Sequence, residues 1–173
     1  FDGCTSLTSI NLSVTAVTSI GAYAFRDCTN LTSLDLSGLT NLTTIGNYAF
    51  RNCTALTTID LSNTAVTSIA SSAFYNCTSL ITLKLSPTMF TVSNSASIGD
   101  SAFYNCPALH EIYIPAGAAE VPKGSSNNPN AFNGCTASDS KIYYDDNGQS
   151  VADNFKKYFT ALEEGDWTVT KVQ

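Results

Sequence analysis

Six cysteines are the residues of this chain best suited to chemistry, as disulfides, metal ligands or nucleophiles. Each stands three residues after a Phe, and the pairs recur every 24 to 29 residues, as Phe1/Cys4, Phe25/Cys28, Phe50/Cys53, Phe74/Cys77, Phe103/Cys106 and Phe132/Cys135. The six cysteines therefore occupy one point of successive repeats, where parallel, inward-pointing Cβ vectors do not face one another and bridge poorly. The spacing favours buried free thiols, packed as small apolar residues, over disulfides.

Metal-binding residues are sparse in the rest of the sequence. The one histidine, His110, stands next to Glu111, and there is no further His or paired Cys at the spacing of a zinc site. Asp145 begins an Asp-Asp-Asn-Gly segment that resembles the start of a calcium loop, but Lys156 stands where an EF-hand needs Glu. We interpret this segment as an Asn-Gly turn that leads into a helix, and we predict no metal and no cofactor.

Catalytic motifs are also missing from the sequence. It contains no G-x-S-x-G nucleophile turn and no glycine-rich phosphate loop. Asp35 and Asp60 recur at equivalent points of neighbouring repeats, without the general acid that catalysis by a carboxylate pair requires. The sequence therefore predicts a protein that is not an enzyme.

The composition fits a chain with a sizeable core and a weakly charged surface. Of its 173 residues, 43% are hydrophobic and only 13% are charged, so one folded domain is expected. The net charge is −6 and the longest basic run is Lys156-Lys157, which argues against nucleic acid or an anionic membrane as partner. No apolar stretch reaches the roughly 18 residues of a membrane-spanning helix, so direct membrane insertion is not predicted.

The elements that position these residues follow from the repeat itself. Each unit reads A-F-x-x-C-x-x-L-x-x-I/L-x-L-S, and this period with Leu or Ile at fixed offsets indicates a solenoid of stacked coils. The I-x-L end alternates apolar and polar residues, so these strands are predicted to stack into one parallel sheet. A second segment, such as residues 17–20, is predicted to be a short return strand or extended stretch. The A-F-x-x-C segment is predicted to be a single helical or 3₁₀ turn.

The later repeats depart from this pattern. The fourth and fifth repeats are longer, and their extra residues, which include 86–88, 93–95 and 122–129, have loop chemistry. We expect these insertions to bulge from an edge or from the outer face. After Cys135 the apolar residues reappear one place late, as Ile142 and Tyr144, so the sixth rung is expected to be distorted or already part of the cap.

Residues 145–173 are predicted to cap a repeat region that spans residues 1–144. Ser150 and Asp153 resemble a capping box, and Gly165 is a helix stop signal. The apolar face of the helix between them would cover the last rung and comprises Val151, Phe155, Tyr158, Phe159 and Leu162. Residues 166–170 alternate like a closing strand, which would shield the sheet edge from another molecule.

These motifs resemble the BspA-like leucine-rich repeats of bacterial surface proteins. The likeness lies in the A-F-x-x-C-x-x-L-x-x-I-x-L unit and in the Ile-Gly steps at Gly21, Gly46 and Gly99, and it covers roughly residues 1–144. The resemblance implies a leucine-rich-repeat solenoid in a secreted or surface-anchored bacterial protein, and some members are similar to adhesins that bind host matrix proteins. Because the chain begins within a repeat, we expect an N-terminal cap and any export signal to lie upstream.

The candidate binding residues lie on the predicted outer face of the sheet. One outward column reads Asn11, Asp35, Asp60, Lys84, Tyr113, and the next reads Ser9, Ser33, Thr58, Thr82, Glu111. The first column changes from small and acidic to basic and aromatic, which suits a contact with a protein or a glycan. The candidate ligand-binding residues are Asp35, Asp60, Lys84, His110, Glu111 and Tyr113.

Three hypotheses for the function follow from these features. The leading one is a noncatalytic extracellular binding or adhesion module that recognises a protein or glycan through the sheet face, with host matrix proteins among the candidate ligands. The alternative is a structural spacer or stalk without a ligand of its own. A third hypothesis is assembly of copies through the N-terminal sheet edge.

Overall fold

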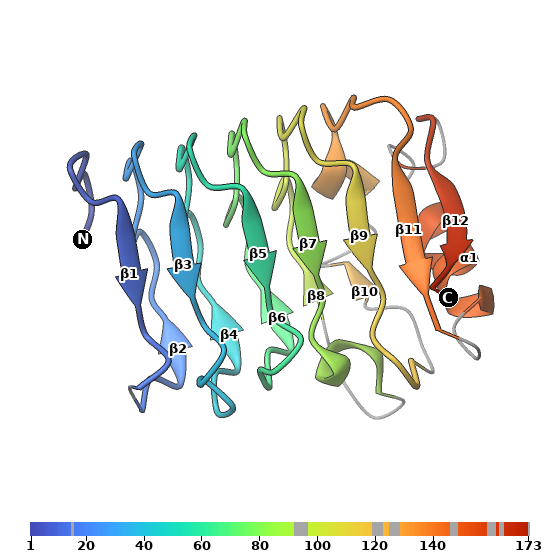
Figure 1. The fold of residues 1–173 in the computed structure, drawn as a ribbon, viewed down its shortest axis with the longest axis horizontal. Coiled ribbons are helices and arrows are strands. Elements are labelled where there is room, and N and C mark those ends of the chain that lie inside the picture. The colour runs from blue at the N-terminus through green and yellow to red at the C-terminus, as the bar shows by residue number, and fades with distance from the viewer. Residues whose placement is uncertain are drawn as a thin grey trace.

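The computed structural model describes residues 1–14, 16–91, 97–118, 123–124, 129–145, 149–158, 162 and 165–172. The chain winds into a solenoid whose rungs lie side by side from the N-terminus to the C-terminus (Figure 1). The front strands are β1 (Ser9–Asn11), β3 (Ser33–Asp35), β5 (Thr58–Asp60), β7 (Thr82–Lys84), β9 (Glu111–Tyr113), β11 (Lys141–Tyr144) and β12 (Thr168–Lys171). The return strands are β2 (Ser19–Ile20), β4 (Thr44–Ile45), β6 (Ser68–Ile69), β8 (Ser97–Ile98) and β10 (Lys123–Gly124).

Both sets of strands pair in parallel, so the predicted single sheet is accompanied by a second one. Within the described residues, the return strands form a sheet in the order β10-β8-β6-β4-β2. The front strands form the order β12-β11-β9-β7-β5, and the ladder is interrupted before the pair β1-β3. The residue after each of β4, β6 and β8 donates its backbone N–H to the preceding rung, and this residue is Gly46, Ala70 or Gly99. A Cβ on either glycine would come within 2.6 Å of backbone in the preceding rung.

A ladder of phenylalanines fills the centre of the coils. Rings of neighbouring rungs stack face to face, with centroids 5.1 Å apart for Phe50 and Phe74 and again for Phe74 and Phe103. The alanine before each phenylalanine is fully buried at Ala49, Ala73 and similar positions, which leaves room for adjacent coils. Each lone rung has too little apolar surface to offset its ordering entropy, so this stacking is what makes the fold stable.

The segment around each phenylalanine is a chain of β-turns, and the predicted helical turn is wrong for most repeats. Hydrogen bonds link Ala24 N to Gly21 O and Cys28 N to Phe25 O, and the third residue of each turn, Tyr23 and Asp27, has a positive φ. A residue with positive φ at this position belongs to a type II turn and cannot continue a helix. A 3₁₀ helix does form in the sixth repeat, as η2 (Pro129–Phe132).

The insertion in the fourth repeat is packed inward, which corrects the expectation that it bulges out. It forms η1 (Pro87–Phe90), whose Met89 and Phe90 are buried. Phe90 contacts Phe155, with ring centroids 6.3 Å apart, so the inserted residues extend the core toward the cap. The loop residues expected at 93–95, 122 and 125–128 lie outside the described residues.

The sixth rung keeps the register of the sheet, contrary to the expected distortion. β11 pairs with β9 so that Ile142 stands beside Ile112 and Tyr143 beside Tyr113. The one-residue shift in the sequence is taken up before the strand, in a turn where Asp139 has a φ of 57°. β11 is therefore a full member of the front sheet.

The C-terminal cap consists of α1 (Gln149–Tyr158) and β12, as Figure 1 shows. The helix begins at Gln149, one residue before the predicted N-cap Ser150, whose side chain lies outside the described ones. The apolar face packs as predicted at Val151, Phe155 and Leu162, while the side chains of residues 158 and 159 lie outside the described ones. β12 pairs in parallel with β11, and Trp167 just before it is buried.

Candidate functional site

The front sheet holds the predicted outward columns in register. Lys84 of β7 stands between Asp60 of β5 and Tyr113 of β9, and Tyr143 of β11 continues this column. The second column, one strand position away, carries Thr58, Thr82, Glu111 and Lys141. The parallel register thus brings Asp60, Lys84, Glu111 and Tyr113 together on one sheet. Asp35, a fifth predicted site residue, lies on β3 of the separate pair β1-β3 and lines one small pocket with Asp60.

The acidic residues of the first column serve the turns that follow their strands. The Asp35 carboxylate accepts hydrogen bonds from the backbone N–H of Ser37, at 3.0 Å, and from its hydroxyl, at 2.8 Å. Asp60 holds Ser62 in the same way, which is the geometry of an Asx turn. The backbone and hydroxyl hydrogen bonds from Ser37 lower the pKa of Asp35. These carboxylates are partly committed to the fold.

Lys84 links two rungs through an ion pair. Its Nζ donates to Asp60 Oδ2 at 2.8 Å, and that hydrogen bond raises the pKa of Lys84. Partial burial opposes ionisation of Asp60, yet the hydrogen bonds from Lys84 and Ser62 leave the pKa of Asp60 below its usual value. Both side chains remain more than 40% exposed, so the pair is accessible to a partner molecule.

An aromatic pair dominates the C-terminal half of the face. Tyr113 and Tyr143 stack with ring centroids 4.6 Å apart and an interplanar angle of 17°. Burial raises the pKa of Tyr113. Beside the pair, Glu111 Oε2 accepts a hydrogen bond from the Thr82 hydroxyl at 2.8 Å, and Lys141 is exposed. We name the group Lys84, Glu111, Tyr113, Lys141 and Tyr143 the sheet patch.

His110 does not join the sheet patch. It precedes β9, and its Nδ1 lies 2.9 Å from the carbonyl oxygen of Ala108 in its own chain segment. Tyr143 and Lys141, by contrast, were not among the residues expected at the site. The sequence did contain evidence for these two residues, because Ile142 and Tyr144 are apolar and the residues that alternate with them must point outward. The one-residue delay after Cys135 concealed which outward column they continue.

A family model described as a BspA type leucine rich repeat region, in six copies, matches residues 1–139. The chain belongs to this family. A solved structure of a leucine-rich repeat protein from Bacteroides ovatus is similar at 18% identity and a TM-score of 0.35. That match covers 100% of this chain and 56% of the other, so the chain spans about half the length of that protein. No curated protein sequence matches.

The six cysteines of this BspA-type repeat are free thiols, as predicted, but the predicted burial is wrong for one of them. Five are buried, and each donates a hydrogen bond to the phenylalanine carbonyl of the preceding rung, as from Cys77 Sγ to Phe50 O at 3.2 Å. Burial raises the pKa of Cys53 and of Cys106 to about 12, so these thiols stay protonated and are poor nucleophiles. Cys4, in the first rung, is exposed.

A polar ladder on the turns was missed by the sequence analysis. Asn52 donates to Asp27 at 2.7 Å, Asn76 to Asn52 at 2.9 Å and Asn105 to Asn76 at 2.7 Å. All four residues have φ between 56° and 61°, and glycines occupy the equivalent places at both ends of the repeat array. The signal is the third letter of each Phe-x-x-Cys unit, which is always Gly, Asp or Asn, the residues that tolerate this conformation.

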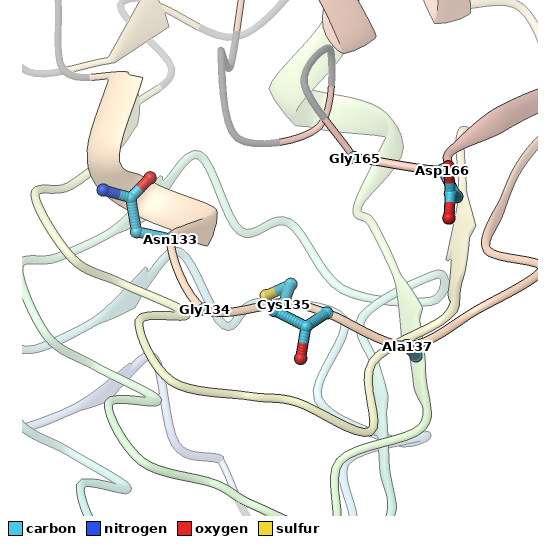
Figure 2. Close-up of a pocket in the computed structure, with 7 residues that line it drawn as sticks. Asn133, Gly134, Cys135, Ala137, Gly165 and Asp166 are labelled. Carbon is cyan, nitrogen blue, oxygen red and sulfur yellow. The ribbon is translucent and has the colours of Figure 1, made fainter.

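Two pockets of this leucine-rich repeat are lined mainly by small and polar residues of the described chain. One of about 540 Å³ lies where the last repeat meets the cap, with Asn133, Cys135 and Ala137 on one segment and Gly165 and Asp166 on another (Figure 2). The Cys135 thiol there is buried and donates to Phe103 O at 3.4 Å. A smaller pocket of about 160 Å³ brings Asp35 and Asp60 together near Asn63.

Metal and membrane features are likewise undetected in the part of the chain that the structure describes. No group of three or more His, Cys, Asp or Glu side chains is gathered there as a metal site would require. No described helix has the length and apolar character needed to cross a bilayer.

Proposed function

We propose that this chain is a noncatalytic binding module of an extracellular bacterial surface protein, and that it recognises a protein ligand through the sheet patch. The leucine-rich repeat family and fold are generally noncatalytic, and BspA-type proteins are typically associated with the bacterial surface. An extracellular protein such as a host matrix component fits this setting. The proposal rests on the stacked pair of Tyr113 and Tyr143 within a ring of accessible charges.

The sheet patch has the chemistry of a protein interface. Aromatic residues and Arg are enriched where proteins bind, and stacked tyrosines offer contact area at low entropic cost. The N-terminal half of the same face carries only small side chains in the second column, with Ser9, Ser33 and Thr58 all exposed. Because both halves present short parallel strands, the chemical contrast supports recognition by the C-terminal half.

A role as a spacer is the competing function, and one observation favours it. The carboxylates of Asp35 and Asp60 are engaged by Ser37 and Ser62, so part of the outward column serves the fold. A sheet face whose side chains only stabilise the adjoining turns would have no specific contacts to offer a ligand.

A binding screen separates these two functions. Purified matrix proteins and a glycan array would be tested against the chain and against the double variant Tyr113→Ala/Tyr143→Ala, with Thr58→Ala as the control on the other half of the face. We expect a matrix protein to bind, with affinity reduced at least about tenfold in the double variant and unchanged in the control. Absence of binding, or equal binding by all three chains, would favour the spacer.

A further inference from the structure

A second group of aromatic and charged residues lies on the turns that connect each return strand to the next front strand. Tyr48 and Tyr75, from neighbouring rungs, flank the guanidinium of Arg51, whose carbon lies 5.8 Å and 5.3 Å from the two ring centroids. We name Tyr48, Arg51 and Tyr75 the turn patch. Tyr48 and Arg51 lie between β4 and β5, and Tyr75 lies between β6 and β7, whereas the sheet patch lies on β7, β9 and β11.

Arg51 has an equivalent one rung earlier whose charge is neutralised. Arg26 also follows its phenylalanine directly and lies over a tyrosine, Tyr23, at 5.0 Å. Its Nε and Nη2 donate to the two oxygens of Asp2 at 2.8 Å and 2.7 Å, and Asp27 lies 3.4 Å away. This bidentate pair shows how a carboxylate binds an arginine in this repeat.

The residues that neutralise Arg26 are replaced around Arg51. The place of Asp2, one rung before, is taken by Arg26 itself, and the place of Asp27 is taken by Asn52. Among the described residues Arg51 forms no ion pair, and its Nε is buried without a hydrogen-bond partner. Arg51 as a whole is half-buried, and the two rings hold its side chain, so few side-chain rotamers remain to be fixed when the exposed part of the guanidinium binds an anion.

We propose that the turn patch binds the carboxylate of an Asp or Glu side chain from a partner protein. The pair of Asp2 and Arg26 is the internal template for this contact. A protein segment fits better than an acidic glycan, because sugars bind aromatic rings through the ring faces. Here Tyr23 covers a face of Tyr48, and Tyr104 covers a face of Tyr75, with centroids 5.2 Å apart in each pair. Arg51 lies between the two pairs, so ring edges and hydroxyls remain for a partner.

Nuclear magnetic resonance of the whole chain tests the proposal directly. The probe is an acetylated and amidated Gly-Asp-Gly-Asp-Gly peptide, and the matched control peptide has Asn in place of Asp. We expect the Nε–H signal of Arg51 to shift saturably with the acidic peptide only. The variant Arg51→Gln should weaken binding about tenfold, which is the loss expected for a charged hydrogen bond, whereas Arg26→Gln should change it less than about twofold.

Three results would overturn the proposal. The Arg51 signal could fail to move, or it could move equally with the Asn peptide, and either result would exclude carboxylate recognition. Tighter binding of a glucuronate disaccharide than of the peptide would identify a glycan as the occupant. Because the wild-type signal is read directly, the test does not depend on the variants, and Tyr113→Ala/Tyr143→Ala should bind the peptide as the wild type does.

Discussion

Two columns of side chains run along this solenoid, one inside the turns and one on the front sheet. The inner column is the same residue at every rung, and its rings stack at 5.1 Å from Phe25 to Phe132. The outer column also lies on parallel strands, yet its side chains vary along the solenoid, from Asp60 to Lys84 to Tyr113.

The difference follows from what each side chain faces. An inner residue is packed between copies of itself, so any change must fit two neighbouring rungs at native packing density. An outer residue faces solvent and must suit only its own strand position. The inner column, which repeats, therefore stabilises the fold, whereas the outer column, which varies, can provide selectivity for a ligand.

The largest expected effect is the loss of one ring from the inner column. Phe74 is fully buried and stacks on both sides, so Phe74→Ala should lower the free energy of unfolding by about 3–5 kcal/mol. Phe1 stacks on one side only and is 64% exposed, so Phe1→Ala should cost less than about 1 kcal/mol. Urea unfolding measures both free energies. Similar losses for the two variants would contradict the claim that a ring stacked on both sides stabilises the fold more than an exposed end ring.

The buried thiols should make stability fall at alkaline pH. An unfolded thiol titrates near pH 8.5, whereas burial raises the pKa of Cys53 to about 12. Between these values the folded chain keeps a proton that the unfolded chain has released. The free energy of unfolding then decreases with rising pH, by about 1.4 kcal/mol per pH unit for each such thiol.

The variant Cys53→Ala isolates this contribution. Its unfolding free energy, measured in urea between about pH 9 and 11, should fall with pH less steeply than that of the wild type, by about 1.4 kcal/mol per unit. Phe74→Ala is the control, because it lowers stability without removing a titrating group. An unchanged slope for Cys53→Ala would mean that the thiol ionises in the folded chain.

Much of the fold could be predicted because the same sequence pattern recurs in each rung. The Phe and Cys spacing predicts the solenoid, and the alternating I-x-L segment predicts both the strands and the outward columns that contain Lys84 and Tyr113. The predicted free thiols also agree with the structure. Repetition makes weak local signals strong, since a chance pattern does not recur six times.

The errors lie where local rules competed with tertiary context. The helical turn was expected from the short Phe-x-x-Cys spacing, but Asn or Asp at its third position favours a left-handed residue that ends a helix. Residues 86–88 were expected to belong to a bulging loop, but the adjoining Met89 and Phe90 are buried, and Phe90 contacts Phe155 of α1. Tyr143 was missed because a turn, and not the apolar spacing, sets the register of β11.

The ladder on the turns should contribute less than the inner column. Asn76 has a φ of 60°, donates to Asn52 and accepts from Asn105. Asn76→Ala should lower the free energy of unfolding by about 1–3 kcal/mol, from backbone strain together with lost hydrogen bonds. Asn76→Gly removes the same hydrogen bonds without the strain, so it should cost about 1 kcal/mol less. Equal losses in urea unfolding would show that the left-handed conformation is not what limits this position.

The smallest expected effect on stability belongs to the outer column. Lys84 and Asp60 form an ion pair that is largely exposed, so Lys84→Ala should change the free energy of unfolding by less than about 1 kcal/mol. The same variant removes a charge from the sheet patch, so it should weaken ligand binding more than it weakens the fold. Thermal unfolding and binding to the same matrix protein, measured on one preparation, give both quantities. A loss of stability close to that of Phe74→Ala would contradict the difference between the two columns, because the outer column would then stabilise the fold as much as the inner one.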